Sequence, residues 1–211
     1  MNPPGNAMRT TPALELGPAD HGRALSLEEY LSARGREGYR YELIDGRVVV
    51  SPAPNFAHEW LVRWLLMALD RYAERHPEVI NFVCGRGRLF VPHRPGATTP
   101  EPDLIAFRDV PEGVPVSAVN WDDLTPVLVA EFLSADNPEK DLVRNVELYE
   151  LAPSVREYWI IDPRADPDRP SLRVYRRRGA RWQKPIDVPF GETYTTRLLP
   201  DFALVIDPHA R

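Results

Sequence analysis

The run VLVAEFL, from Val127 to Leu133, is the part of the sequence that decides the fold. All but one of its residues are apolar, which is typical of a strand buried on both faces in a sheet flanked by helices. The exception is Glu131, which shares a strand face with Val129 because side chains alternate along a strand. An unpartnered buried carboxylate is costly, so Glu131 is expected to pair with a cation, hold a metal or lie at a solvent-open strand end.

The sequence on both sides of this run predicts the rest of the sheet and its helices. Ser26 with Glu29 three residues later forms a capping-box pattern, and Asp45-Gly46 between two β-rich runs is a strong hairpin signal. Further strands are predicted at 39–44, 47–51, 79–84, 87–91, 103–107, 157–162, 171–177 and 181–188, and helices at 26–35, 56–75 and 138–151. This order predicts an α/β (α+β) fold: a mixed central β-sheet flanked by helices, with an N-terminal and a C-terminal β-hairpin.

The composition indicates one globular domain. The chain has 211 residues, 26 basic against 31 acidic, and a formal net charge of −5. No apolar stretch approaches the roughly 20 residues that cross a bilayer, and the N-terminus does not read as a secretory signal. The single cysteine, Cys84, excludes a disulfide within the chain and makes the cytoplasm the default compartment. Residues 1–23 are expected to form a flexible arm before a single domain at 24–208.

Three acidic residues stand in predicted strands or at a strand mouth, where carboxylates are costly. Glu42 lies in the strand at 39–44, Asp103 directly follows Pro102, and Glu131 interrupts the apolar run. If Asp103 and Glu131 converge from neighbouring strands, their oxygen atoms suit a hard cation such as Mg²⁺ or Mn²⁺. From the spacing alone, an ion pair between Glu131 and an arginine is an equally good interpretation.

Several short motifs, taken in their order and spacing, resemble one known family. Pro102-Asp103 is followed by Glu131-Phe132-Leu133-Ser134, then a predicted helix, then Glu157-Tyr158-Trp159 and Asp162-Pro163. The other matching residues are Tyr41-Glu42-Leu43-Ile44-Asp45-Gly46, Ser51-Pro52, His58, Asp141 and Tyr149. Over residues 24–208 this pattern resembles the Uma-type family of restriction-endonuclease-like proteins, a bacterial group with the PD-(D/E)XK nuclease fold.

The resemblance implies a divalent-metal-dependent endonuclease that hydrolyses DNA phosphodiester bonds. In such nucleases the acids hold one or two Mg²⁺ or Mn²⁺ ions, which activate water and stabilise the charge that develops on the phosphate. By resemblance, Asp103 is the aspartate of the PD element and Glu131 the acid of the (D/E)XK element. The carbonyl oxygen of Phe132 is implied as a further metal ligand, and Glu42 as a ligand through water.

The lysine of the superfamily is missing from its usual positions. Two residues after Glu131, on the same strand face, the chain has Leu133. The Uma-type family commonly has a lysine four residues after the aspartate that matches Asp141, and this position is Asn145. Asparagine can orient water or a phosphate oxygen, but it carries no charge and cannot transfer a proton.

Only two lysines, Lys140 and Lys184, are available as substitutes. Lys140 is predicted near the start of the helix that contains Asn145. It is either a solvated helix residue, the interpretation favoured by the sequence, or a catalytic group. Arg144 is expected to point about 100° away from Asn145 around the helix. The altered set leaves a second function open, a catalytically impaired nuclease fold that serves as a binding or regulatory module.

His58 and the basic residues are the remaining candidates for contact with a substrate. His58 follows the spacing of the core-facing residues of its helix, so it is either a hydrogen-bonded core residue or a group that supports the acids or the substrate. The C-terminal hairpin is crowded with Arg173, Arg176, Arg177, Arg178, Arg181 and Lys184. They form either a solvated hairpin tip or a DNA-binding edge, because affinity for nucleic acid depends on positive charge.

The aromatic residues and the possible partners complete the expectations. Trp60, Trp64, Tyr149, Tyr158 and Trp159 fall at periodic apolar positions and are predicted to be core rather than base-stacking residues. RNA is an alternative to DNA as the substrate, because the arrangement handles phosphates rather than bases. A homodimer is expected, since nucleases that cut both strands often pair their active sites.

Overall fold

A mixed seven-stranded sheet forms the centre of the computed structural model, which describes residues 13–210. Its strands are β5 (Phe82–Cys84), β6 (Leu104–Phe107), β7 (Pro126–Phe132), β8 (Glu157–Asp162), β9 (Ser171–Arg178), β10 (Arg181–Trp182) and β11 (Ile186–Val188). The order along the sheet is β10-β9-β8-β7-β6-β5, with β11 also paired to β9. Within this sheet β7 and β8 are parallel and the other neighbours are antiparallel. The predicted mixed central sheet is confirmed, and every residue of β7 is buried.

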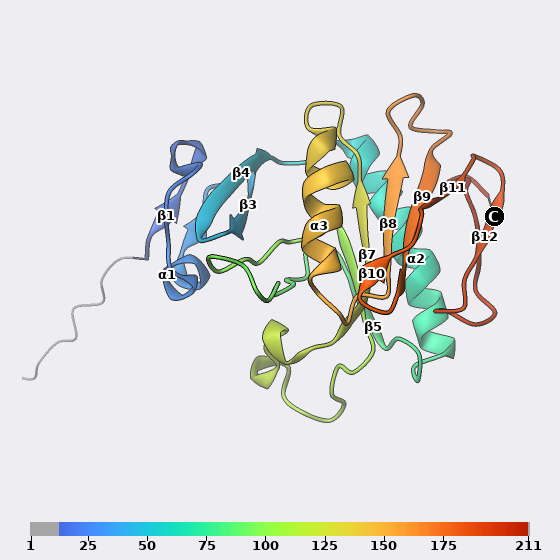
Figure 1. Cartoon of the computed structure of the whole chain (residues 1–211), viewed down its shortest axis with the longest axis horizontal. Helices are drawn as coiled ribbons and strands as arrows, with labels where there is room; N and C mark the ends of the chain where they lie inside the picture. Colours follow the sequence, from blue (N-terminus) through green and yellow to red (C-terminus); the bar gives the residue numbers. More distant parts are fainter. Residues whose placement is uncertain (1–12, 211) are drawn as a thin grey trace, which may run out of the picture.

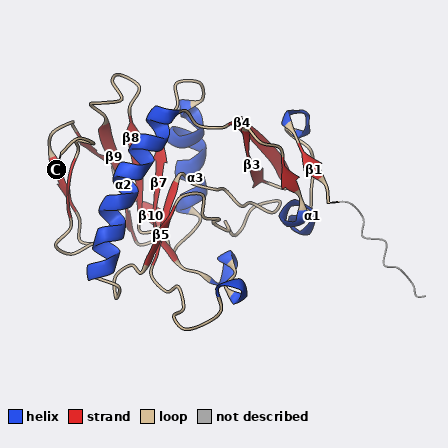
Figure 2. Ribbon diagram, turned by 180° about the vertical axis from the view of Figure 1, so that it is seen from behind, coloured by secondary structure: helices blue, strands red, loops and turns tan. Residues whose placement is uncertain are grey.

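Helices cover both faces of this sheet (Figure 1, and from behind in Figure 2). The long helix α2 (Phe56–Arg75) packs on the face that carries Phe132. The shorter helix α3 (Asn145–Glu150) packs on the face that carries Val129. Glu131 alternates with Phe132 and therefore points to the α3 face. Between residues 13 and 210, no helix is both long and apolar enough to cross a membrane.

A smaller unit precedes the central sheet and lies at one end of the molecule (Figure 1). It contains β1 (Glu15–Leu16), α1 (Leu27–Ser32), β2 (Arg34–Gly35), β3 (Tyr39–Ile44) and β4 (Arg47–Pro52). The predicted hairpin is the antiparallel pair β3 and β4, and Asp45 and Gly46 both have positive φ in its turn, as a type I′ connection requires. The predicted capping box of Ser26 and Glu29 is also present. Local sequence signals therefore define this unit well.

Packed structure begins before the predicted boundary at residue 24. β1 pairs in parallel with β2, and Leu16 is buried against Leu25 and Tyr30. The sequence suggested an arm through residue 23 because a two-residue strand is too short to produce a periodic pattern. The first part of that predicted arm, residues 1–12, lies outside the described residues.

Two other segments differ from the sequence prediction. Residues 87–91 were predicted as a strand but do not form one; they run beside the segment before Asp103, with the amides of Leu89 and Val91 bonded to the carbonyls of Pro100 and Thr98. Beyond the predicted C-terminal hairpin, the chain adds an antiparallel pair, β12 (Thr193–Thr195) and β13 (Ala203–Val205). These short pieces depend on long-range neighbours rather than on local propensity.

The predicted helix at 138–151 is helical from residue 138 to residue 150, but it is not regular throughout. Most of its first half is a π-helical turn, η4 (Lys140–Arg144), which continues directly into α3. The amide of Asn145 donates to the carbonyl of Lys140, five residues earlier, instead of four as in an α-helix. The wider turn changes the direction in which the side chains of this segment point.

Candidate active site

The two acids of the predicted site lie side by side where β6 and β7 meet. The antiparallel register pairs Leu104 with Ala130, which brings Asp103 next to Glu131. The amide of Asp103 donates to Glu131 Oε2 at 3.2 Å, and the amide of Phe132 donates to Asp103 Oδ2 at 2.9 Å. Both carboxylates are buried. The structure therefore brings together the acid pair predicted from the sequence.

Asp103 lies between two side chains from other elements. Arg40 of β3 donates to Asp103 Oδ1. His58, in the first turn of α2, places its Nε2 atom 3.3 Å from the same oxygen. That nitrogen is buried and has no aligned hydrogen-bond partner, while the imidazole ring packs against Phe132. His58 is therefore a neighbour of the acids, not a hydrogen-bonded core residue.

Arg40 was not identified from the sequence. It lies two residues before Glu42 in β3, so both side chains are on the same face of that strand. The sequence signal that could have identified Arg40 is its place beside Glu42 on one face of a hairpin strand. Their relation to Asp103 depends on how the hairpin packs on the central sheet, which local patterns do not reveal.

Glu131 is oriented by two neutral side chains from α3. Asn145 Nδ2 donates to Glu131 Oε1 at 2.8 Å, and the hydroxyl of Tyr149 donates to the same oxygen at 2.6 Å. Asn145 Nδ2 also donates to Asp141 Oδ1 at 2.9 Å. Asn145 and Tyr149 are one helical turn apart and so share a face. At the position where the family commonly has a lysine, Asn145 supplies hydrogen bonds rather than charge.

Lys140 lies inside the acidic cluster and not in solvent. Its Nζ atom is 4.0 Å from Glu42 Oε2 and 3.8 Å from Asp141 Oδ1, and its side chain is only 19% exposed. Arg144 Nη2 donates to Glu42 Oε2 at 2.9 Å. The favoured interpretation of Lys140 as a solvated residue is wrong. Arg144 was expected to point about 100° away from Asn145, but its Nε atom donates to Asn145 Oδ1 at 3.0 Å, because the π-helical turn changes the α-helical angles that this expectation assumed.

Burial and like charge set the protonation of two of these acids. Burial raises the pKa of Glu131 well above its usual value, and the nearby carboxylates of Asp141, Asp103 and Glu42 add to this rise against the opposing effect of Lys140. Burial also raises the pKa of Asp141 to about 6. Both acids therefore hold their protons more tightly than they would in water.

The pKa values of Asp103 and Lys140 shift in the directions that favour their charged forms, because charges of opposite sign surround both groups. Burial alone would raise the pKa of Asp103, but His58, Arg40 and Lys140 outweigh burial and lower it. Burial alone would lower the pKa of Lys140, but the surrounding carboxylates, with Glu131 first, raise it. Asp103 is therefore ionised and Lys140 protonated at neutral pH.

The donor set fits a hard divalent cation. Within residues 13–210, no lysine or arginine nitrogen lies within 4.0 Å of the Glu131 carboxylate. The amide of Phe132 points towards Asp103. Because the carbonyl of a strand residue points to the same side as its amide, the carbonyl oxygen of Phe132 also points to the side of Asp103. Carboxylate and carbonyl oxygens are the ligands that Mg²⁺ prefers. In the same range, no three Asp, Glu, His or Cys side chains converge as a complete ligand set, so backbone oxygen and water would complete it.

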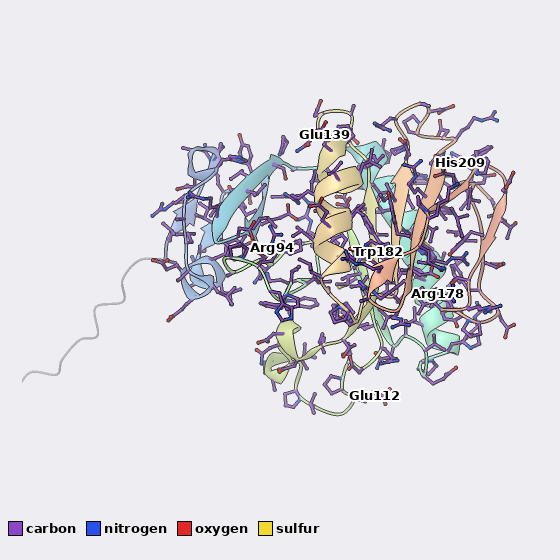
Figure 3. All side chains as sticks on the ribbon, viewed as in Figure 1. Arg94, Glu112, Glu139, Arg178, Trp182 and His209 are labelled. Carbon is purple, nitrogen blue, oxygen red and sulfur yellow. The ribbon has the colours of Figure 1, made fainter. Side chains whose placement is uncertain are left out.

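Three of the six basic residues of the C-terminal hairpin interact with other parts of the protein. Arg177 is buried, donates to the backbone carbonyls at the end of α3, and lies 4.4 Å from the ring of Trp182, which Figure 3 labels. Arg173 pairs with Asp187, and Arg181 pairs with Glu150. These interactions reduce the positive charge that the hairpin can offer to DNA.

The aromatic residues divide into two groups. Tyr149, Tyr158 and Trp159 are fully buried, which confirms them as core residues, and Trp64 packs partly against the core. Trp60 is 44% exposed, so its assignment to the core is wrong. Trp60 flanks the buried stripe of α2, and its exposure depends on what packs beside that helix.

Comparisons with known proteins place this fold and site in a family. A solved structure of a "putative nuclease belonging to DUF820" from Anabaena variabilis is 18% identical; the match covers 86% of this chain and 95% of that chain with a TM-score of 0.64, which shows a shared fold. A comparison with curated proteins found no match. The model of the Uma2 family, described as "Putative restriction endonuclease", matches residues 27–207. This span is most of the chain, and the protein therefore belongs to the Uma2 family.

Proposed function

We propose that this protein is a divalent-metal-dependent endonuclease that hydrolyses DNA phosphodiester bonds. Its family and its structural neighbour are both described as nucleases, which supports a nuclease function in general. The observation that carries the proposal is the buried pair of Asp103 and Glu131, joined through backbone amides, with Lys140 in the same cluster. Several carboxylates buried together are costly, and such clusters are typical of functional sites.

Asp103, Glu131 and the carbonyl of Phe132 would hold Mg²⁺ or Mn²⁺, and Glu42 is placed to contribute through water. The bound ion would supply Lewis-acid stabilisation of the phosphate and a water molecule of lowered pKa. The chain keeps these ligands in place. The amides of Asp103 and Phe132 restrain the two carboxylates, and Asn145 and Tyr149 restrain Glu131 Oε1.

Lys140 takes the part of the lysine that Leu133 and Asn145 do not supply. Its protonated Nζ can form a charge-assisted hydrogen bond to a phosphate oxygen and donate a proton to the oxygen that leaves. Glu42 and Asp141 position it at the site. Within residues 13–210 the buried His58 Nε2 has no aligned hydrogen-bond partner, and at 3.3 Å from Asp103 Oδ1 it is placed to support that carboxylate.

Nicking of supercoiled plasmid DNA by the purified full chain tests the proposal. We expect cleavage with Mg²⁺ or Mn²⁺ that stops when EDTA is added. Asp103→Asn should abolish it, whereas Asp187→Asn, which changes a carboxylate far from the site, should not. Equal nicking by the wild type and Asp103→Asn would show that the activity does not come from this site.

The two lysines provide a matched pair for the role of Lys140. Lys140→Met should lower the nicking rate by about 100-fold or more, which is the contribution of a general acid. Lys184→Met removes the only other lysine and should leave the rate unchanged. Lys140→Arg keeps the charge and should recover only part of the rate, because arginine does not give up its proton. Equal rates for the two Met variants would restrict Lys140 to a structural role.

Asn145 at the position of the family's lysine favours a second candidate, a nuclease fold that binds without turnover. Calorimetric titration with Mn²⁺ separates the two: absence of both metal binding and nicking would favour the binding module. Cleavage of labelled RNA but not DNA would reassign the substrate. The homodimer and the cytoplasmic location stay predictions, which sedimentation and cell fractionation would test.

A further inference from the structure

A groove of about 430 Å³ lies between helix α2 and strand β13. Figure 2 shows α2 in front of the sheet. The residues that α2 contributes repeat every three or four positions and thus follow one helix face. They are Trp60, Arg63, Trp64, Met67, Ala68 and Arg71. Tryptophan and arginine side chains therefore lie together along one wall, over about 16 Å at 1.5 Å per residue.

An exposed row of rings marks one end of this groove. Phe56, at the start of α2, is 81% exposed, and its ring centroid is 6.3 Å from that of Trp60. On the other side the ring of His209, labelled in Figure 3, lies 6.4 Å from Trp60. The rings of Phe56 and His209 are each tilted by about 30° to the ring of Trp60, and all three are open to solvent rather than packed into the core. Large exposed aromatic surface of this kind marks an interaction site.

The groove wall is also positively charged. Arg63 and Arg71 are exposed, and within residues 13–210 neither has an acidic oxygen within 4.0 Å. Asp207 is the one acid that lines the groove, and it contributes to the wall opposite α2. If a second copy of this chain occupied the groove through a two-fold axis, the same arginines would face each other. The charge thus favours a polyanion over self-association.

We propose that this groove binds single-stranded nucleic acid. Bases stack on Trp60 and its neighbouring rings, and Arg63 and Arg71 contact phosphates, which is the general design of single-strand binding surfaces. Trp60 is two residues after His58, whose side chain lies beside Asp103. These two side chains point about 200° apart around the helix, so the groove lies on a different face of α2 from the proposed active site. The proposal does not rest on the proposed function, because binding itself needs no catalysis.

Fluorescence anisotropy of a labelled oligothymidylate, titrated with the full chain in EDTA, tests binding without cleavage. Trp60→Ala should weaken binding by about tenfold, as expected for the loss of one stacked base. Trp121→Ala changes a tryptophan of similar exposure (37%) elsewhere and should bind like the wild type. The double variant Arg63→Gln, Arg71→Gln should reduce the slope of log Kd against log salt by about 1.4, or roughly 0.7 for each phosphate that the protein no longer neutralises. Arg178→Gln should not change this slope.

Cross-linking locates the bound strand directly. An oligonucleotide that carries bromouracil should cross-link on irradiation to the peptide that contains Trp60. The proposal is overturned if Trp60→Ala and the double arginine variant bind like the wild type, or if the cross-link maps elsewhere. It is also overturned if light scattering shows a dimer that Trp60→Ala dissociates without any loss of oligonucleotide affinity. Because every binding assay contains EDTA, these outcomes do not depend on whether the protein cleaves DNA.

Discussion

Two buried glutamates on the neighbouring strands β7 and β8 have opposite surroundings. Glu131 points to the α3 face and lies among Asp103, Asp141 and the ammonium of Lys140. Glu157 points to the α2 face and accepts hydrogen bonds from neutral groups only. Its donors are Trp159 Nε1 at 2.8 Å, the hydroxyl of Tyr194 at 3.1 Å and the hydroxyl of Thr196.

The comparison shows what distinguishes the acid of the proposed active site from a buried acid on the other face of the same sheet. Burial raises the pKa of both glutamates, so burial alone does not distinguish them. Around Glu157 three hydrogen bonds from neutral donors oppose the rise. Around Glu131 further carboxylates increase it. The neighbouring carboxylates, not burial, are therefore what distinguishes the surroundings of Glu131 from those of Glu157.

Exchange of each glutamate for glutamine should separate the two roles most clearly. Glu131→Gln should reduce metal-dependent nicking by more than about 100-fold, beyond the roughly 10- to 100-fold effect of residues that only support metal ligands. Glu157→Gln should leave the nicking rate of the folded protein unchanged. It should lower the free energy of unfolding by about 1–3 kcal/mol, because the amide group faces donors that it cannot satisfy. Plasmid nicking and urea unfolding of both variants check this.

A loss of activity in Glu157→Gln at full folded concentration would contradict the comparison. So would normal nicking by Glu131→Gln. Circular dichroism of each variant before the assay serves as the control for folding.

The tyrosines that bond to the two glutamates allow a milder test. Tyr149→Phe removes a donor to Glu131 and should slow nicking by about tenfold, the lower end of the effect of groups that orient metal ligands. Tyr194→Phe removes a donor to Glu157 and should cost about 1 kcal/mol of stability with no change in rate. If the two variants slow nicking equally, the roles of the two faces are not distinct.

The pH dependence of stability should show the smallest difference. The pKa of Glu157 is raised in the folded state, so the folded protein binds its proton more tightly than the unfolded chain does. Its contribution to stability is therefore highest below the unfolded pKa of about 4.5 and falls as pH rises towards the folded pKa. Glu157→Gln should lose less stability than the wild type between about pH 4 and pH 7. Parallel pH profiles from thermal unfolding would contradict this.

Local patterns in the sequence predicted the elements with strong periodicity or turn chemistry. The buried run at 127–133 appears as β7 within one residue, and the helix at 56–75 as α2. The meeting of Asp103 and Glu131 could not follow from such patterns alone, because it depends on which strands are neighbours. The family resemblance supplied that relation.

The predictions that proved wrong concern side-chain direction. Arg144 was placed with α-helical angles, which a π-helical turn does not obey, and Lys140 was taken as solvated because it lies near the start of a helix. Trp60 was assigned to the core because it flanks the buried stripe of α2, but β13 leaves a groove beside it. Whether a residue at the edge of a helical stripe is covered depends on distant parts of the chain, not on its own spacing.

The number of residues in the π-helical turn determines which acid each side chain of this segment contacts. Within the turn, Lys140 and Arg144 form ion pairs with Glu42. After the turn, Asn145 and Tyr149 donate hydrogen bonds to Glu131. The additional residue in the turn determines the angle around the helix axis between these two pairs of side chains. Deleting one residue from the turn would restore regular α-helical geometry and rotate one group relative to the other. The position of Lys140 beside Glu42 therefore depends on the number of residues in the turn as well as on the lysine itself.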